Sequence, residues 1–334
     1  MSEVCPPPSS QLAKNVTVTN HEGLGSASPA QRERRNLRSP GVSRRRRRSD
    51  HVGYLLVAPL FVLVVGLVIV PAAFTLGESF FNVNELNPPV RFSGLSNFRQ
   101  LVENSVVRMA TVNTAVYVVV GVTLATLLGI LMAVLLQRRF RGRSVVIALL
   151  ILPWALPGVI EGIVWEGIYD PNVGLLNSVL TSLHLIHHYQ TWLGENRFVT
   201  IALIELVQVW QIAPLSALLI LTALQVIPDE LYQVGRLDGC SSWSSFRRIT
   251  LPLARGGIAI AMAQAVIATL NVFDIPYVLN GTAPTAAPLT METYLVSFQD
   301  LNFGQGYALS LFVTVVTISI SFIVVKTVYR QVEY

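Results

Sequence analysis

Six long apolar runs constrain the fold of this chain more than any other feature of its sequence. They cover roughly residues 53–77, 112–136, 144–168, 198–224, 256–281 and 307–330. A helix needs about 20 apolar residues to cross the hydrocarbon core of a bilayer, and each run is long enough. Prolines inside the runs, such as Pro71 and Pro153, kink helices but are tolerated in membrane bundles. The sequence therefore predicts an all-α membrane protein, with a bundle of six transmembrane helices over residues 51–334.

The composition favours the same class. The chain has 334 residues, of which 52% are hydrophobic and 13% are charged. Soluble domains carry roughly 25% charged residues, so this chain has too few charges to cover a soluble surface. The composition therefore indicates a membrane protein.

The basic residues predict the orientation, because cytoplasmic loops carry an excess of Lys and Arg. With the N-terminus inside, four of the 24 lysines and arginines lie on the outer side: Arg91, Arg99, Arg108 and Arg197. We therefore expect both termini in the cytoplasm and a multi-pass protein of the inner membrane. Residues 1–50 are rich in Ser, Pro, Gly and Arg, which predicts a disordered, Arg-rich cytoplasmic tail. Its run Arg44–Arg48 suits anionic lipid of the bilayer better than nucleic acid.

No motif for catalysis or nucleotide binding is present. The sequence has no G-x-x-x-x-G-K-[ST] phosphate loop, no H-E-x-x-H and no Ser/His/Asp arrangement. The histidines of HLIHHY, which are His184, His187 and His188, have no carboxylate or cysteine at ligand spacing, so we expect no metal site there. We therefore predict a non-enzymatic chain without cofactors of its own. Any work driven by ATP would fall to another polypeptide.

One polar stretch, residues 228–253, interrupts the apolar chain. Pro228 can occupy the first turn of a helix, and Gly239 can adopt a positive φ and end that helix. Ser241 can then cap a second short helix, and Pro252 opens the next span. The stretch therefore predicts a cytoplasmic helix–turn–helix, which is suited to docking into a groove of a partner protein.

The same stretch carries a spaced motif. It reads Gln233-Val234-Gly235-x-x-Asp238-Gly239, then nine residues, then Ile249-Thr250-Leu251-Pro252. The pattern resembles E-A-A-x-x-D-G-x(9)-I-x-L-P, the loop motif of the permease subunits of binding-protein-dependent ABC importers. The segments GLSNFRQL and FDIPYVLNG are similar to the sugar and glycerol-phosphate (maltose-type) branch of that family, and the resemblance covers about residues 53–334. Gln-Val-Gly stands here in place of Glu-Ala-Ala, and Gly235 costs its helix about 1 kcal/mol relative to Ala.

The resemblance implies one half of a translocation path for a sugar or related polyol, coupled to a separate ATPase subunit through residues 228–253. It also implies a second homologous permease subunit, two ATPase subunits that hold ATP and Mg, and an extracytoplasmic substrate-binding protein. The candidate coupling residues are Glu230, Gln233, Gly235, Arg236, Asp238, Gly239, Phe246 and Arg247.

Polar side chains within the spans mark a candidate substrate path, because ionisable groups in a membrane are costly and usually functional. Amides, carboxylates and Trp suit a polyhydroxylated ligand through hydrogen bonds and an aromatic face. The alternative for each is a structural hydrogen bond between helices. Gln264, Asn271 and Asp274 fall roughly on one helical face of the fifth span. The candidate substrate-binding residues are Glu161, Glu205, Gln208, Trp210, Gln264, Asn271 and Asp274.

Two other classes of protein are alternatives to an importer subunit. A gradient-driven secondary transporter would need an internal inverted repeat, and none is visible in the sequence. A membrane-anchored scaffold that uses the Arg-rich tail would not need carboxylates inside its spans.

Overall fold

The computed structural model describes residues 46–86, 88–138 and 140–328. Most of the expected tail, residues 1–45, lies outside the described residues. The chain divides into two compact units, Met1–Phe74 and Thr75–Tyr334. The boundary at residue 50 between tail and permease domain stays a prediction.

The first expected span is helical throughout. Its three segments are α1 (Arg46–Val64), η3 (Val65–Ile69) and α2 (Val70–Glu78). The π-helical turn η3 comes just before Pro71, whose missing N–H removes one regular helix bond. The N–H of Val70 bonds the carbonyl of Val65, five residues back, which is the spacing of a π-bulge. The run 53–77 is therefore one helical span with a bulge at its proline.

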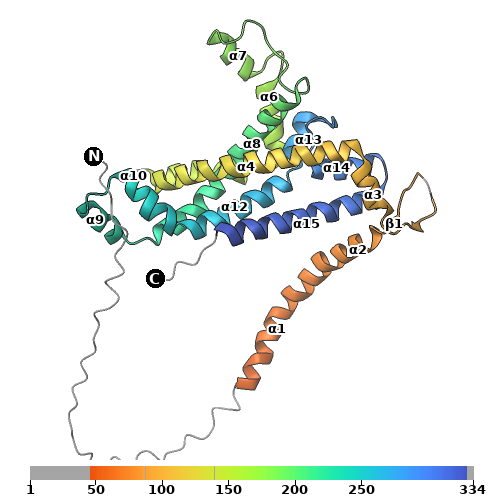
Figure 1. Cartoon of the computed structure of the whole chain (residues 1–334), viewed down its shortest axis with the longest axis horizontal. Coiled ribbons are helices and arrows are strands. Elements are labelled where there is room, and N and C mark those ends of the chain that lie inside the picture. The colour runs from red at the N-terminus through yellow and green to blue at the C-terminus, as the bar shows by residue number, and fades with distance from the viewer. Residues whose placement is uncertain (1–45, 87, 139, 329–334) are drawn as a thin grey trace, which may run out of the picture. The chain divides into compact units, whose positions relative to one another are not determined.

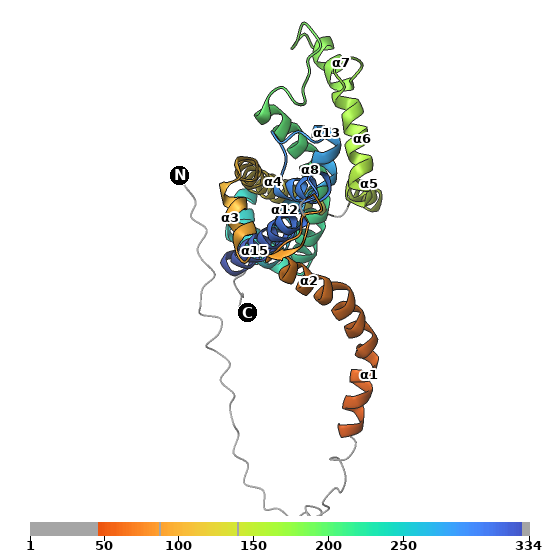
Figure 2. The same cartoon turned by 90° about the vertical axis from the view of Figure 1, so that its right-hand side faces the viewer.

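Four long helices form the core of the second unit and lie side by side (Figure 1, Figure 2). They are α4 (Ser105–Gln137), α8 (Arg197–Gln225), α12 (Arg255–Leu270) and α15 (Phe303–Val328). A Cβ added to Gly129 of α4 would lie 2.9 Å from Cβ of Ser216 on α8. One added to Gly257 of α12 would lie 2.4 Å from Cβ of Ala223 on α8. Small residues therefore allow α8 to pack closely against both neighbours.

The third expected span is bent rather than straight. The run 144–168 forms α5 (Arg143–Ala155) and α6 (Gly158–Tyr169), whose axes differ by 94°. A residue before proline avoids the helical backbone, and Leu156, before Pro157, is extended with ψ 144°. Pro157 therefore turns the chain, and the kink expected from the prolines of this run is large.

The fifth expected span, 256–281, is also broken. Helix α12 ends at Leu270, and a separate helix, α13 (Asp274–Asn280), follows. Pro276 has no N–H to bond the carbonyl of Val272, as a continuous helix would require. The hydroxyl of Thr290 donates to that carbonyl instead. The run 256–281 is therefore divided after Leu270, and a side chain replaces the bond that Pro276 cannot make.

Four unbroken helices in the described part of the chain are long and apolar enough to cross a membrane, and six if each of two bent pairs counts as one span. The second bent pair joins residues Ser242–Leu253 to α12 at an angle of 69°. A short antiparallel ribbon, β1 (Phe81–Asn82) with β2 (Arg91–Phe92), accompanies the helices. The expected class, an all-α membrane bundle, is confirmed.

Short helices gather at the two ends of the bundle (Figure 1). At the end where α15 finishes lie α9 (Asp229–Leu237) and α10 (Ser242–Ser245), and at the opposite end lie α3 (Ser96–Glu103) and α14 (Leu289–Tyr294). The remaining short helices are α7 (Leu175–Ser182), η4 (Phe246–Thr250), α11 (Leu251–Leu253) and η5 (Leu295–Gln299). The helix–turn–helix therefore shares one end of the bundle with the last helix, as the expected orientation requires.

Candidate functional site

Two polar side chains of α8, Glu205 and Gln208, are buried in the bundle, with 2% and 1% of their surface exposed. Neither the carboxylate oxygens of Glu205 nor the amide atoms of Gln208 have a hydrogen-bond partner among the described residues. Buried polar groups normally find such partners. These two side chains are therefore candidates for contact with a ligand or another subunit.

The carboxylate of Glu205 has room in the bundle because its neighbour on α4 is a glycine. A Cβ added to Gly121 would lie 2.2 Å from Oε1 of Glu205 and 3.3 Å from Cγ2 of Thr269 on α12. Any larger residue at position 121 would push the carboxylate away. The carboxylate thus sits where α4, α8 and α12 meet.

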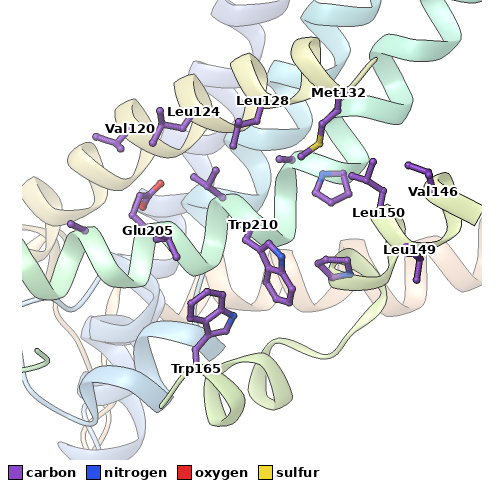
Figure 3. A pocket seen from close by; sticks show the side chains of 16 residues that line it. Val120, Leu124, Leu128, Met132, Val146, Leu149, Leu150, Trp165, Glu205 and Trp210 are labelled. Carbon is purple, nitrogen blue, oxygen red and sulfur yellow. The ribbon is translucent and has the colours of Figure 1, made fainter. Parts of the chain in front are cut away.

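A cavity of about 800 Å³ opens between α4, α5, α6 and α8 (Figure 3). Its walls are mostly aliphatic, and Glu205, Trp165 and Trp210 also line it. The two indole rings meet edge to face, with centroids 5.6 Å apart. The structure therefore brings Glu205 and Trp210 to one cavity and adds Trp165, which sequence reasoning missed. A usable signal was present, because Trp165 is a large aromatic residue in an apolar run that also carries ionisable groups.

Glu161 lies on α6, with 1% of its surface exposed and neither carboxylate oxygen hydrogen-bonded to a described residue. It does not line the cavity beside Glu205. Next to it, a Cβ added to Gly162 would lie 2.8 Å from Cβ of Val278 on α13. Glu161 is therefore part of the segment that packs against α13, apart from the α8 pair.

Gln264 and Asn271 lie on one face of α12, together with the exposed Ile260 and Ile267. Gln264 is half-buried, and its amide oxygen has no hydrogen-bond partner among the described residues. Asn271 is exposed at the end of the helix, where its Nδ2 donates to the carbonyl of Ile267 at 2.8 Å. That bond uses one of the two N–H groups of the amide, so the second N–H and the amide oxygen of Asn271 remain available to a ligand.

Asp274 does not continue this face on the same helix, which corrects the expectation. It is the first residue of α13, beyond the break, and its side chain is exposed. A Cβ added to Gly158, the first residue of α6, would lie 2.9 Å from Oδ2 of Asp274. A carboxylate beside the first turn of a helix is favourably placed in the field of the helix. Asp274 therefore also serves the packing of α6 against α13.

The helix–turn–helix predicted from the polar stretch is present in detail. Helix α9 ends in a Schellman motif: the N–H of Cys240 bonds the carbonyl of Gly235 at 2.8 Å, and that of Gly239 bonds Arg236 at 3.1 Å. Gly239 has φ +79°, as this motif requires. The Ser241 hydroxyl then accepts from the N–H of Ser244 and caps α10. The bend is thus fixed by residues that are adjacent in sequence.

Most of the predicted coupling residues are exposed on this loop. The exposed ones are Glu230, Gln233, Arg236, Asp238, Gly239 and Arg247. Gly235 is buried instead, and a Cβ there would lie 3.2 Å from Cδ1 of Ile249, so the two arms of the loop pack closely. Phe246 is half-buried and stacks on Trp243, with ring centroids 5.5 Å apart.

Two large apolar side chains of the loop were missed by sequence reasoning. Leu237 and Trp243 are 87% and 70% exposed. A signal existed, because each is a large apolar residue within an otherwise polar stretch. Exposed apolar side chains that flank a rigid bend are the kind of group that fills a pocket on a partner.

These features define a multi-pass membrane permease, with polar groups buried in its spans and a projecting helix–turn–helix. Residues 125–333 match the family described as "Binding-protein-dependent transport system inner membrane component", and the chain belongs to that family. It is therefore a membrane-spanning permease subunit of an ABC importer in the inner membrane, and the gradient-driven alternative is not supported.

Curated relatives align over most of the chain. The trehalose/maltose transport system permease protein MalF of Thermococcus litoralis is 32% identical over 286 residues, which is 85% of this chain and 96% of the relative. The sulfoquinovosyl glycerol transport system permease protein SmoG of Agrobacterium fabrum is 30% identical, over 77% of this chain and 84% of its own. The trehalose transport system permease protein SugA of Mycobacterium tuberculosis is 25% identical, over 82% and 88%.

A solved structure shares the fold. It is described as a bacterial ABC transporter involved in the import of the acidic polysaccharide alginate. The TM-score is 0.73 at 20% sequence identity, over 86% of this chain and 98% of the other. A second solved structure, described as a bacterial alginate ABC transporter in complex with an alginate pentasaccharide-bound periplasmic protein, gives a TM-score of 0.72.

Proposed function

We propose that this chain forms half of the translocation path of an ATP-driven importer for a sugar or a related polyol. The observation that carries the proposal is the cargo named for three relatives. One is named for trehalose and maltose, one for sulfoquinovosyl glycerol and one for trehalose. Each of these compounds presents many hydroxyl groups on pyranose rings. A binding site for them needs amide or carboxylate partners and an aromatic face.

The polar side chains of the spans suit such a ligand. Asn271 offers its amide oxygen on the exposed face of α12, and Gln264 lies on the same face. Trp210 is 40% exposed and offers an indole face to a sugar ring. Glu205 and Gln208 supply further hydrogen-bonding groups that have no partner among the described residues.

Glu161 and Asp274 complete the proposed substrate-binding set, on the segments α6 and α13 that pack together. Both helices begin at a break in a membrane span. Transporter sites commonly form at broken helices near the midplane. Asp274 would then combine a place on the path with its packing role against Gly158.

The energy for import would come from a partner, and this chain would perform no catalysis. We assign the contact with an ATPase subunit to residues 228–253, whose exposed side chains include Glu230, Gln233 and Arg236. ATP binding would close two ATPase subunits and shift the coupling loops attached to them. The Schellman bend at Gly239 makes this loop stiff enough to transmit such a shift.

The remaining partners follow from the same proposal. A second homologous permease subunit would supply the other half of the path, and an extracytoplasmic binding protein would deliver the sugar. Both termini would lie in the cytoplasm, with the basic tail of residues 1–50 against anionic lipid.

Uptake kinetics of an Asn271→Leu variant test the substrate path. The change removes an acceptor and a donor from a site that must replace water around a sugar hydroxyl. A lost hydrogen bond of this kind costs roughly 0.5–1.5 kcal/mol, which corresponds to roughly a 2- to 12-fold weaker affinity. We expect uptake of labelled maltose or trehalose at limiting concentration to fall by about this factor, while the maximal rate stays similar.

Ile260→Leu is the matched control, because Ile260 is an exposed residue on the same face of α12 and leucine keeps its volume. Co-purification with the ATPase should be unchanged in both variants. If the double variant Asn271→Leu/Gln264→Leu takes up sugar with wild-type kinetics, this face of α12 is not part of the path.

A further inference from the structure

A second cavity of about 470 Å³ lies at the end of the bundle away from the coupling loop, between α14, η5 and the first turns of α15. Its lining is unusual for a membrane protein. Apart from Gly306, every described residue that lines it is either aromatic or carries a Ser or Thr hydroxyl. Its volume falls within the range of small-molecule sites, roughly 300–1,000 Å³.

The aromatic residues form a continuous row. They are Phe273, Tyr294, Phe298, Phe303 and Tyr307. Consecutive ring centroids are 5.1, 5.2, 5.7 and 6.4 Å apart. The row starts in the break between α12 and α13 and ends on α15, and Phe298 within it is 60% exposed. Flat apolar faces of this kind stack against the C–H faces of sugar rings.

Several of the lining hydroxyl groups donate their protons to backbone carbonyls. Ser297 donates to the carbonyl of Thr293, and Thr293 donates to that of Leu289, each at 2.7 Å. Ser310 likewise donates to the carbonyl of Gly306 at 2.9 Å. A hydroxyl oxygen that donates its proton to the backbone keeps its lone pairs. The cavity therefore offers a set of acceptors to a ligand rich in O–H groups.

The shape of the cavity depends on Gly306. A Cβ added there would lie 1.9 Å from Oγ of Ser297, so glycine is needed for η5 and α15 to approach each other. The hydroxyl of Thr290 also holds α14 to the break through the carbonyl of Val272. The walls of the cavity are thus fixed by specific contacts between three segments.

The chemical character of the lining residues favours a neutral, polyhydroxylated ligand over an ionic ligand or an acyl chain. Among the residues that the structure describes, no charged residue and no Leu, Ile, Val or Met lines the cavity. An ionic ligand would find no counter-charge, and an acyl chain would leave the hydroxyl acceptors without donors. A neutral, polyhydroxylated ring satisfies both the aromatic faces and the acceptors.

We propose that this cavity is a second carbohydrate site, which binds a neutral pyranoside at the outer end of the bundle before it reaches the polar face of α12. The site rests on the proposed function, since it takes the same class of cargo. It differs from the proposed path residues, none of which lines it. Phe273 stands two residues from Asn271, so the row of rings begins beside the proposed path.

Equilibrium binding of radiolabelled maltose and trehalose to the assembled transporter in nanodiscs tests the site. Phe298→Ala removes a half-exposed ring without opening the core, and should weaken binding roughly three- to tenfold. Phe298→Trp keeps an aromatic face and should bind as the wild type does. Phe322→Ala is the matched control, because Phe322 is a 65% exposed ring further along α15, and it should leave the affinity unchanged.

Uptake measured in parallel separates the two proposals. If the wild-type transporter takes up sugar and Phe298→Ala binds it with the same affinity as Phe322→Ala, this site is overturned and the proposed function stands. A wild-type transporter that takes up no sugar would overturn the proposed function and the site with it. If Phe298→Ala binds the sugar more weakly and added short-chain phospholipid restores that sugar binding, the occupant of the cavity is a lipid. This result would also overturn the site.

Discussion

The carboxylate of Asp274 packs against the backbone of Gly158, so that a Cβ added to Gly158 would lie 2.9 Å from Oδ2 and 3.0 Å from Cβ of Asp274. The contact joins the first residue of α6 to the first residue of α13. Both helices start where an expected span is broken. The two breaks are therefore in contact, although they are more than a hundred residues apart in sequence.

We expect Gly158→Ala to lower the thermal stability of the purified chain, because Cβ of Asp274 is fixed to the backbone and cannot swing away. Asp274→Gly removes both close atoms, so the double variant should recover much of the loss. Contacting residues commonly couple by roughly 0.5–3 kcal/mol. Thermal unfolding of the two single variants and the double variant measures this coupling. Gly167→Ala on the same helix is the control, since a Cβ there meets nothing within 4 Å; strictly additive effects would contradict the contact.

Gly239→Val should uncouple transport from ATP hydrolysis. Gly239 has φ +79°, which a β-branched residue adopts only with strain, so the Schellman bend should be lost. The subunit should still insert, because no span changes. We expect low uptake, with ATP hydrolysis that is reduced or no longer depends on substrate. Gly194→Val is a matched control with a similar φ of +89° outside the loop. Normal uptake by Gly239→Val at normal expression would show that this bend is not the coupling element.

Cysteine labelling tests the orientation that the basic residues predict. In a chain whose two native cysteines are replaced by serine, Leu185→Cys should react with a membrane-impermeant thiol reagent added outside intact cells. Ser242→Cys should react only after the cells are opened. Both positions are exposed in the structure, so access to the reagent depends on the membrane. The reverse pattern would contradict the proposed topology and the cytoplasmic coupling loop.

Asp170 should stabilise the turn that follows α6 in a pH-dependent way. Hydrogen bonds from the N–H groups of Val173 and Asn172 to its carboxylate hold the pKa of Asp170 below its ordinary value of 3.8. A lowered pKa in the folded state adds stability above pH 3.8 that is lost as the pH falls through the lowered pKa. We expect Asp170→Ala to reduce the hydrogen-exchange protection of this turn at neutral pH. The exposed Glu195→Ala is the control, and equal protection in both variants would contradict the role of Asp170.

Much of this fold could be predicted because its signals are local. The length of an apolar run sets whether a helix can cross a bilayer, and the residues of the run carry that information themselves. The helix–turn–helix is local in the same way, since the hydrogen bonds at Gly239 and Ser241 join residues no more than five positions apart. Pro157 also marks its own bend, although the size of that bend depends on packing.

For the candidate site, the sequence indicated which residue types to consider, but it did not give their arrangement in space. The rule that polar residues in apolar spans are candidates selected Glu205, Gln208, Gln264 and Asn271. In the structure, the first three have a side-chain polar atom without a hydrogen-bond partner among the described residues, and Asn271 is exposed. The shared face with Asp274 was wrong, because it assumed that a helix continues through Asn271. The bond that a continuous helix would make at Pro276 is lost, and Thr290, from a later segment, takes its place.

By itself, the sequence determined the membrane class and the bend of the loop and predicted an orientation, because hydropathy, charge and backbone preference act over a few neighbouring residues. Only the tertiary structure decided which distant residues meet. It set Asp274 against Gly158, gave Glu205 room beside Gly121, and arranged rings and hydroxyls of α14, η5 and α15 around one cavity. These contacts arise from the close packing of segments that are far apart in the chain, and pattern and spacing along the sequence carry no record of that packing.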